Sequence, residues 1–137
     1  EHKIYDKLNP IFRGFDDVFY VPHSRHTEIR REDILKNPEL TLLSESEESG
    51  VYMVMARNGR DFFITGHSEY SASTLDTEYK RDVKKGLPIK MPVNYYRENN
   101  PANEPVVLWR SHANLLFTNW LNYFVYQETP YDLANIQ

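Results

Sequence analysis

The sequence predicts an α/β fold, in which a small sheet is followed by two helices. Residues 40–65 contain three runs of apolar, β-branched and aromatic side chains separated by turn signals, which is typical of an antiparallel β-meander. The last run ends at Gly66, and a helical pattern begins soon after it. A second helical pattern, over residues 111–127, is apolar on most of its sides.

The composition is that of an ordinary globular domain and argues against several classes of function. The 137 residues are 40% hydrophobic, and their net charge of −4 disfavours nucleic acid as the main partner. No apolar run approaches the roughly 20 residues that cross a bilayer, and no signal peptide is recognisable. The chain contains no cysteine, which excludes a disulfide framework and a thiolate metal site. We therefore expect neither a nucleic-acid partner nor a membrane partner.

The segment before the meander predicts one short strand and one short helix. Residues 1–14 carry turn signals and predict an irregular entry to the fold. Residues 18–21 predict a strand that ends at Pro22, because proline lacks the N–H that a sheet ladder needs. A polar loop follows, and a short helix is expected over residues 29–36.

The meander itself predicts three strands, over residues 40–44, 51–56 and 62–65. An acidic turn separates the first two strands. Asn58 and Gly59 stand between the second and the third, and this dipeptide is a strong signal for a two-residue hairpin. The third strand is therefore expected to return antiparallel to the second.

Two helices are expected after the meander. The first begins at a cap, Ser73 or Thr74, ends near Gly86, and buries a stripe at steps of four formed by Leu75, Tyr79 and Val83. Residues 87–105 form a long loop rich in proline and asparagine, which suits a lid or an interface segment. The second helix, over residues 111–127, is expected to be deeply buried or to lie in a subunit interface.

The most informative stretch for chemistry is the end of the third strand. Gly66 predicts a sharp turn with backbone angles closed to other residues. His67 and Glu69 follow, and a carboxylate that orients an imidazole makes a general base with a fixed tautomer. The pair accounts for two members of a nucleophile–His–acid triad. The alternative is an ordinary surface hydrogen bond between the two side chains.

Three other groups of residues are candidate components of a site. Ser24 lacks the Gly-x-Ser-x-Gly context of a nucleophilic serine and fits a substrate hydrogen-bond donor better. Arg81 suits bidentate capture of a carboxylate, although a surface salt bridge is the commoner role of a helical arginine. His23 and His26 stand three apart in a loop, which is a weak pattern, and we expect no metal site.

Several motifs together identify a resemblance to a known family. They are residues 15–17 (Phe-Asp-Asp), 22–25 (Pro-His-Ser-Arg), 65–70 (Thr-Gly-His-Ser-Glu-Tyr), 129–133 (Thr-Pro-Tyr-Asp-Leu) and the long block 109–123. They resemble the homoserine O-acyltransferase family of methionine biosynthesis, of the homoserine O-succinyltransferase type, some of whose members transfer acetyl. The resemblance spans essentially the whole chain.

The resemblance implies a fold and a mechanism. The fold is an α/β/α sandwich similar to the class I glutamine amidotransferase domain, with a mostly parallel central sheet. A cysteine nucleophile is acylated by acyl-CoA, the co-substrate, and is then attacked by the homoserine hydroxyl; no further cofactor is implied. His67 matches the general base and Glu69 the residue that orients it. Arg81 matches the ligand of the homoserine carboxylate, and Ser24 matches a substrate contact tied to acceptor specificity.

The resemblance also implies that the chain is incomplete as a catalyst. The family's cysteine, oxyanion hole and acyl-CoA contacts lie N-terminal to this sequence. We therefore expect residues 1–137 to be the C-terminal half of a single domain that is active only with its N-terminal half. A homodimer in the cytoplasm is expected. The sequence does not choose between acetyl-CoA and succinyl-CoA.

Two other functions remain open at this point. One is a class I glutamine amidotransferase-like enzyme or a related triad hydrolase, in which ammonia or water takes the place of homoserine and Arg81 has no carboxylate to hold. The other is a non-catalytic binding or assembly module whose helix 111–127 forms a contact surface. For the acyltransferase, we expect His67, Glu69 and Ser24 to line one cavity, with Arg81 reaching back toward His67.

Overall fold

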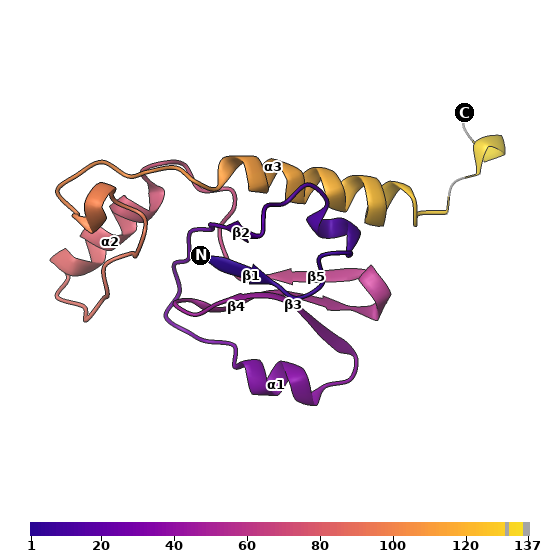
Figure 1. Ribbon diagram of the computed structural model, residues 1–137, viewed down its shortest axis with the longest axis horizontal. Helices are drawn as coiled ribbons and strands as arrows, with labels where there is room; N and C mark the ends of the chain where they lie inside the picture. Colours follow the sequence, from indigo (N-terminus) through magenta and orange to yellow (C-terminus); the bar gives the residue numbers. More distant parts are fainter. Residues whose placement is uncertain (131, 136–137) are drawn as a thin grey trace.

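The computed structural model describes residues 1–130 and 132–135, and its centre is a five-stranded sheet (Figure 1). The strands follow the order β2-β1-β3-β4-β5. Their bounds are β1 His2–Ile4, β2 Val18–Phe19, β3 Leu40–Ser46, β4 Gly50–Ala56 and β5 Asp61–Ile64. Tyr131 of the motif at 129–133, and residues 136–137 of the predicted tail, lie outside the described residues.

Every strand pairing in the described part of the chain is antiparallel. Short connections join β3 to β4 and β4 to β5, and such connections can only reverse the chain. The predicted meander over residues 40–65 is therefore confirmed. The mostly parallel sheet of an amidotransferase-like sandwich is not found among these strands, and that finer description stays a prediction for the complete protein.

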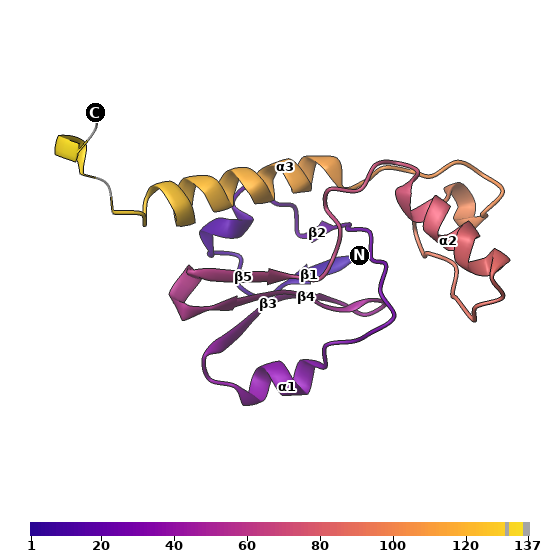
Figure 2. The same cartoon turned by 180° about the vertical axis from the view of Figure 1, so that it is seen from behind.

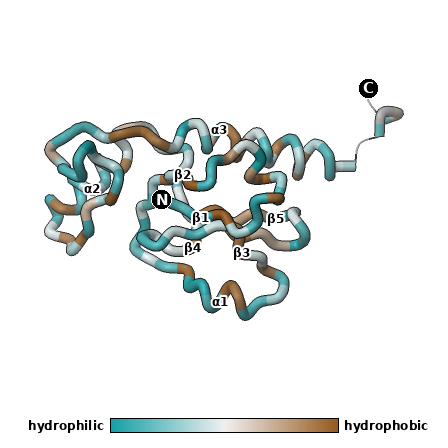
Figure 3. Tube along the Cα trace, in the orientation of Figure 1, coloured by the Kyte–Doolittle hydropathy of each residue, from teal (hydrophilic) through white to brown (hydrophobic). Residues whose placement is uncertain are grey.

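Helices cover both faces of the sheet, so the chain is an α/β structure in layers (Figures 1 and 2). Helix α1, Arg31–Lys36, buries Ile34 against Leu42, Val51 and Val54 on one face. Helix α3, Arg110–Asn119, buries Leu116 on the other face, in a core with Ile11, Phe12, Phe19, Leu43, Tyr52 and Met53. Figure 3 shows hydrophobic residues along the strands and at intervals along α3.

The sheet order brings three chain segments to one end of the sheet. Because each neighbouring pair is antiparallel, β2, β3 and β5 run in one direction. The segments that follow them, residues 20–28, 46–50 and 65–70, therefore share one end, and the N-terminal end of β1 lies there too. This end of the sheet carries the predicted site residues His67, Glu69 and Ser24.

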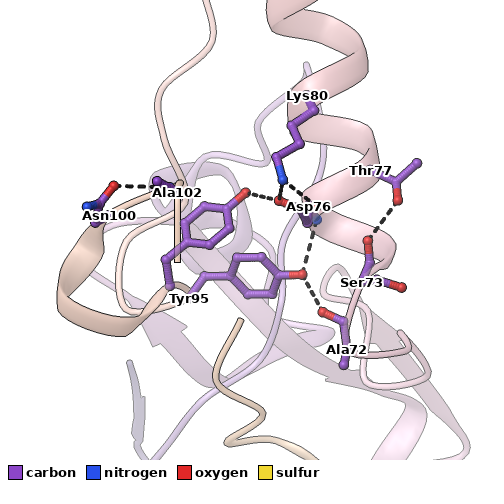
Figure 4. Close-up of polar contacts among 9 residues, drawn as sticks. Ala72, Ser73, Asp76, Thr77, Lys80, Tyr95, Asn100 and Ala102 are labelled. Atoms are coloured by element: carbon purple, nitrogen blue, oxygen red, sulfur yellow. Dashed lines mark hydrogen bonds and ion pairs between the residues drawn. The ribbon is translucent and has the colours of Figure 1, made fainter. Parts of the chain in front are cut away.

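A separate lobe, residues 71–108, lies beyond that end of the sheet (Figure 1, left). We call it the α2 lobe, after helix α2, Thr74–Lys84. Its small core is formed by Leu75, Tyr95 and Tyr96 with Trp109. Asp76 connects its parts: its carboxylate accepts a hydrogen bond from the Tyr96 hydroxyl at 2.7 Å. It also pairs with Lys80, one turn further along α2 (Figure 4). The Tyr95 hydroxyl donates to the carbonyl of Ala72 at 2.5 Å.

The structure corrects three local predictions before residue 90. The predicted irregular entry contains β1, a strand too short for its alternation to stand out in the sequence. The predicted two-residue hairpin is instead a longer turn over residues 57–60, because Arg57, Asn58 and Gly59 all have positive φ. In α2, the predicted buried stripe is wrong at Val83, which is 48% exposed. Asp82 is buried instead, because the chain turns back after the helix and the backbone N–H of Leu87 donates to the Asp82 carbonyl.

The last helix also differs from its prediction. After Asn119 the α-helix continues as a wider π-helix, Trp120–Tyr126. Among the α3 side chains only Ala113, Leu116 and Asn119 are buried, and large apolar residues stay exposed along α3 and the π-helix: Phe117, Trp120, Leu121 and Tyr126. Within the described part of the chain this helix is therefore not deeply buried, and its burial in an interface stays a prediction. No helix in the described part of the chain is long and apolar enough to cross a bilayer.

Candidate active site

The segment that follows β5, residues 65–70, is held in place at almost every position; we call it the His67 loop. The Thr65 hydroxyl donates to the Val51 carbonyl at 2.6 Å. The backbone N–H of His67 donates to the Pro22 carbonyl at 2.8 Å. Buried Ser68 shares a hydrogen bond of 3.2 Å with the Tyr52 hydroxyl. The loop is thus fixed to β4 and to the segment after β2, and its side chains start from a rigid backbone.

Glycine is required at position 66 because a side chain would have no room there, and not because of the backbone angles. The described glycines with positive φ are Gly14, Gly50, Gly59 and Gly86, so the predicted special conformation at Gly66 is wrong. A Cβ atom at Gly66 would lie 2.7 Å from the Val21 side chain and 2.9 Å from Nε2 of His23. The loop packs so closely on the segment after β2 that no side chain fits between them.

His67 and Glu69 form the predicted contact. Nδ1 of His67 lies 2.9 Å from Oε1 of Glu69. A carboxylate only accepts hydrogen bonds, so Nδ1 carries the proton and Nε2 has the lone pair that can accept one. Burial raises the pKa of the Glu69 carboxyl, but hydrogen bonds from its own backbone N–H and from His67 outweigh this and leave the pKa lowered. Glu69 therefore stays ionised and orients a basic imidazole.

The pair is only partly covered within this chain. The His67 side chain is 33% exposed and that of Glu69 is 62% exposed. Closing a site expels water and strengthens the electrostatic interactions inside it. The pair therefore has the geometry of an oriented imidazole, but no element among the described residues covers it.

A second polar group lies directly beneath the loop. Nε2 of His23 lies 2.9 Å from Nε2 of buried His2, and Nδ1 of His23 lies 2.7 Å from the Arg25 guanidinium. Arg25 can only donate, so His23 carries its proton on Nε2 and donates it to His2. The proton of His2 then sits on Nδ1, which is buried and has no hydrogen-bond partner among the described residues.

Burial keeps both of these histidines neutral. It is the first cause that lowers the pKa of His2 to about 3, with the neighbouring His23 adding to it. The pKa of His23 is likewise lowered to about 3 by burial, and next by Arg25 and His67. Arg25 is only two residues from His23, but His2 is 21 residues away, so nothing in the His-x-x-His spacing pointed to the contact between the two histidines.

A cavity of about 630 Å³ lies between the sheet end and the α2 lobe. Ser24 lines it from the sheet side, while Glu78 and Asp82 line it from α2. His67 and Glu69 are not among its walls, so the prediction that they share a cavity with Ser24 is wrong for this chain. The described residues contain no group of three or more potential metal ligands.

Arg81 makes a different contact from the one that its proposed role requires. Its Nε and one terminal nitrogen lie 2.6 and 2.8 Å from the two carboxylate oxygens of Asp82. This hydrogen-bonded pair raises the pKa of Arg81 and lowers that of Asp82. The Arg81 side chain is half exposed and does not line the cavity, whereas Asp82 does. In this chain Arg81 therefore has the surface ion pair that was its alternative interpretation.

Comparison with known proteins places this geometry in a family. A family model described as homoserine O-succinyltransferase matches residues 1–131. A homoserine O-acetyltransferase of Phocaeicola vulgatus is 77% identical over 136 residues, which cover 99% of this chain and 45% of the relative. The enzyme of the same name from Brevibacillus brevis is 65% identical over 134 residues, covering 98% and 44%.

A more distant relative gives the same result. The homoserine O-acetyltransferase of Agathobacter rectalis is 56% identical over 134 residues, covering 98% of this chain and 43% of the relative. The chain thus spans less than half the length of these relatives. The match of the family model extends over nearly all of the chain, including the His67 loop, the segment with Ser24 and helix α2. The chain therefore belongs to the homoserine O-succinyltransferase family.

Proposed function

We propose that this chain is the part of a homoserine O-acetyltransferase that supplies the general base and the acceptor side of the active site. The complete protein would transfer acetyl from acetyl-CoA to the hydroxyl of homoserine, on the route to methionine. The observation that carries the proposal is the His67–Glu69 hydrogen bond on a fixed loop, in a chain that belongs to this family. The acetyl donor is preferred to succinyl because the similar relatives are named acetyltransferases.

In the proposed mechanism His67 moves one proton. The acetyl group is first held as a thioester on a cysteine outside these residues, since the chain contains none. The homoserine oxygen attacks the thioester carbon while Nε2 of His67 takes the hydroxyl proton. The C–S bond then breaks, the thiolate leaves, and the imidazolium can return the proton to it. Glu69 holds the imidazole in the tautomer that this transfer needs and stabilises the imidazolium.

The acceptor is proposed to bind in the cavity beside the α2 lobe. Ser24 offers a hydroxyl there. Arg81 does not line the cavity in this chain, but it lies on the same helix as Glu78 and Asp82, which do, and its planar guanidinium already holds the carboxylate of Asp82. A homoserine carboxylate would take the place of Asp82 or share the guanidinium with it. Homoserine and acetyl-CoA are the only small molecules that this scheme requires.

The rest of the enzyme is proposed to complete the sheet. The edge of β5 that faces away from β4 is unpaired among the described strands. An apolar groove of about 400 Å³ runs beside it, lined by residues of β5 and α3 that include Phe63, Ile64, Phe117 and Trp120. A strand from the remaining part of the protein, added there, would complete an α/β/α sandwich and cover the His67 loop. A homodimer in the cytoplasm is the proposed state of the whole enzyme.

The test uses the full-length protein. It is expected to form O-acetylhomoserine from acetyl-CoA and homoserine faster than it uses succinyl-CoA. His67→Ala should lower turnover by orders of magnitude, because both the thiol and the hydroxyl need a base. Glu69→Gln should cost less, since the imidazole survives, and Glu39→Gln, on the exposed surface, serves as the matched control. An inactive wild-type protein, or near-normal turnover of His67→Ala, would overturn the proposal.

A further inference from the structure

Tyr70 lies against the imidazole of the base. The rings of His67 and Tyr70 are stacked, with centroids 4.3 Å apart and planes inclined by only 15°. The backbone N–H of Tyr70 also donates to the His67 carbonyl at 3.2 Å, which closes the turn between them. One face of the imidazole is therefore covered by a flat ring, while its edge is held by Glu69.

Tyr70 is itself held from two other directions. Its hydroxyl donates to both carboxylate oxygens of Glu78 on α2, each at 3.1 Å. Its carbonyl accepts a hydrogen bond from Nε1 of Trp109 at 3.1 Å. Burial and next the Glu78 carboxylate raise the pKa of Tyr70 to about 12, opposed by a hydrogen bond with Ser24. The phenol thus stays a neutral donor to the α2 lobe.

These contacts connect the base to the acceptor side. Glu78 and Ser24 line the cavity beside the α2 lobe, whereas His67 does not. The Tyr70 side chain contacts both: its ring stacks on His67, and its hydroxyl donates to Glu78 in the wall of the cavity. The other supports of His67 come from Glu69 and from Pro22, neither of which belongs to the α2 lobe.

We propose that Tyr70 is a positioning residue that sets the plane of the His67 imidazole relative to the acceptor bound beside the α2 lobe. The inference rests on the proposed function, because it assumes that His67 is the base. A base whose plane is fixed reaches the acceptor hydroxyl without first losing rotational freedom, and a displacement of about 1 Å can cost about a hundredfold in rate. Tyr70 touches the base and not the reacting atoms, so its effect must pass through His67.

The experiment compares three variants of the full-length enzyme. Tyr70→Leu removes the stacked ring, Tyr70→Phe keeps the ring but loses the bonds to Glu78, and Tyr96→Phe is the matched control. Tyr96 belongs to the α2 lobe and also loses a hydroxyl hydrogen bond, to Asp76, but it neither contacts His67 nor lines the cavity. Kinetic constants for both substrates and melting temperatures are measured for each variant.

Tyr70→Leu is expected to lower kcat by about tenfold to a hundredfold while the KM values of homoserine and acetyl-CoA change by less than about threefold. Tyr70→Phe should recover most of that loss, because the stack survives. Tyr96→Phe should lower the melting temperature and leave kcat nearly unchanged. In single-turnover assays, Tyr70→Leu should add little further loss to His67→Ala, since both act through one group.

Three outcomes would overturn the inference: unchanged kcat in Tyr70→Leu, a loss of kcat in Tyr96→Phe as large as that in Tyr70→Leu, or fully additive losses with His67→Ala. If Tyr70→Leu does not fold, Tyr70→Phe decides through its kcat, which should show a small residual fall, greater than that in Tyr96→Phe and far smaller than that in His67→Ala. A wild-type enzyme that does not transfer acetyl would contradict the proposed function itself. An active enzyme in which substitutions of Tyr70 leave kcat unchanged would contradict only the inference about Tyr70.

Discussion

The guanidinium of Arg81 donates hydrogen bonds to both carboxylate oxygens of its neighbour Asp82. This bidentate geometry is the one by which arginine binds carboxylates in general. The Asp82 side chain is buried beside the cavity, while that of Arg81 is half exposed. The exposed half of the Arg81 side chain is therefore open to a second carboxylate, which is the basis of the role proposed for it.

Arg81→Lys in the full-length enzyme is expected to raise the KM of homoserine more than that of acetyl-CoA. A point charge loses the second hydrogen bond to the carboxylate, at a cost on the order of 1.5–3 kcal/mol, or about tenfold to a hundredfold in kcat/KM. Arg57→Lys is the matched control, since Arg57 forms the same fork with Asp61 on the β4–β5 turn. Slower acylation of the enzyme with an unchanged homoserine KM would contradict the role given to Arg81.

Sequence patterns were most useful at this scale where neighbours in the chain are neighbours in space. His67 and Glu69 are two apart, and their contact was predicted correctly. Gly66 was singled out for the wrong reason, since the constraint comes from Val21 and His23, which a local pattern does not contain. The stack of Tyr70 on His67 was missed because an aromatic residue after a polar turn is usual and carries no signal of its own.

At the scale of elements, β1 and the segment after β2 meet through two uncharged histidines, buried His2 and partly buried His23. His2 and His23 have pKa values of about 3, below the ordinary value of 6.5, first because of burial. Between those two pH values the unfolded chain binds protons that the folded chain does not. Stability contributed by the neutral pair is therefore present above pH 6.5 and is lost as the pH falls.

The free energy of unfolding is thus expected to fall below pH 6.5 by on the order of 1 kcal/mol per pH unit for each histidine. Urea unfolding of the full-length enzyme between pH 7 and pH 5 measures this slope. His23→Gln should flatten it, because one titrating ring is removed, whereas His26→Gln, on the exposed part of the same segment, should leave it unchanged. An equal slope in His23→Gln would show that the pair does not titrate as described.

The elements that the sequence predicted well are those with a strong period. The meander alternates clearly and ends in turn residues, so β3, β4 and β5 were placed to within a few residues. Strand β1 has too few residues to alternate, and it exists because β2 and β3 pair with it on either side. The change from α-helix to π-helix after Asn119 leaves no mark on the apolar pattern, which continues through it.

At the scale of the whole molecule, the chain presents an apolar surface that none of the described residues covers. Phe63, Ile64, Phe117 and Trp120 are all more than a third exposed around the groove beside β5 and α3. Such a surface beside a free strand edge favours association. The sequence predicted apolar excess in helix 111–127, but only the sheet order shows that the excess lies next to the free edge of β5.

The isolated chain is therefore expected to be poorly stable or to self-associate. Sedimentation velocity and thermal unfolding of residues 1–137 provide the measurement. Trp120→Asp should reduce association by placing a charge in the groove. Leu8→Asp is the control, because Leu8 is 94% exposed but lies outside the groove. A monomeric chain with a cooperative melt would contradict this expectation.

The α2 lobe leaves the sheet-bearing part after Tyr70 and rejoins it at Trp109, and these two residues are hydrogen-bonded to each other. Both connecting segments run side by side to the lobe (Figures 1 and 2). The lobe is therefore an insertion whose two ends lie at a single point of the sheet-bearing part. Whole lobes could be exchanged among family members without moving the base, provided that the incoming α2 keeps a carboxylate where Glu78 stands. Under the proposed function, the part of the acceptor site that α2 supplies would then be inherited as one unit, while the part around Ser24 would stay with the sheet.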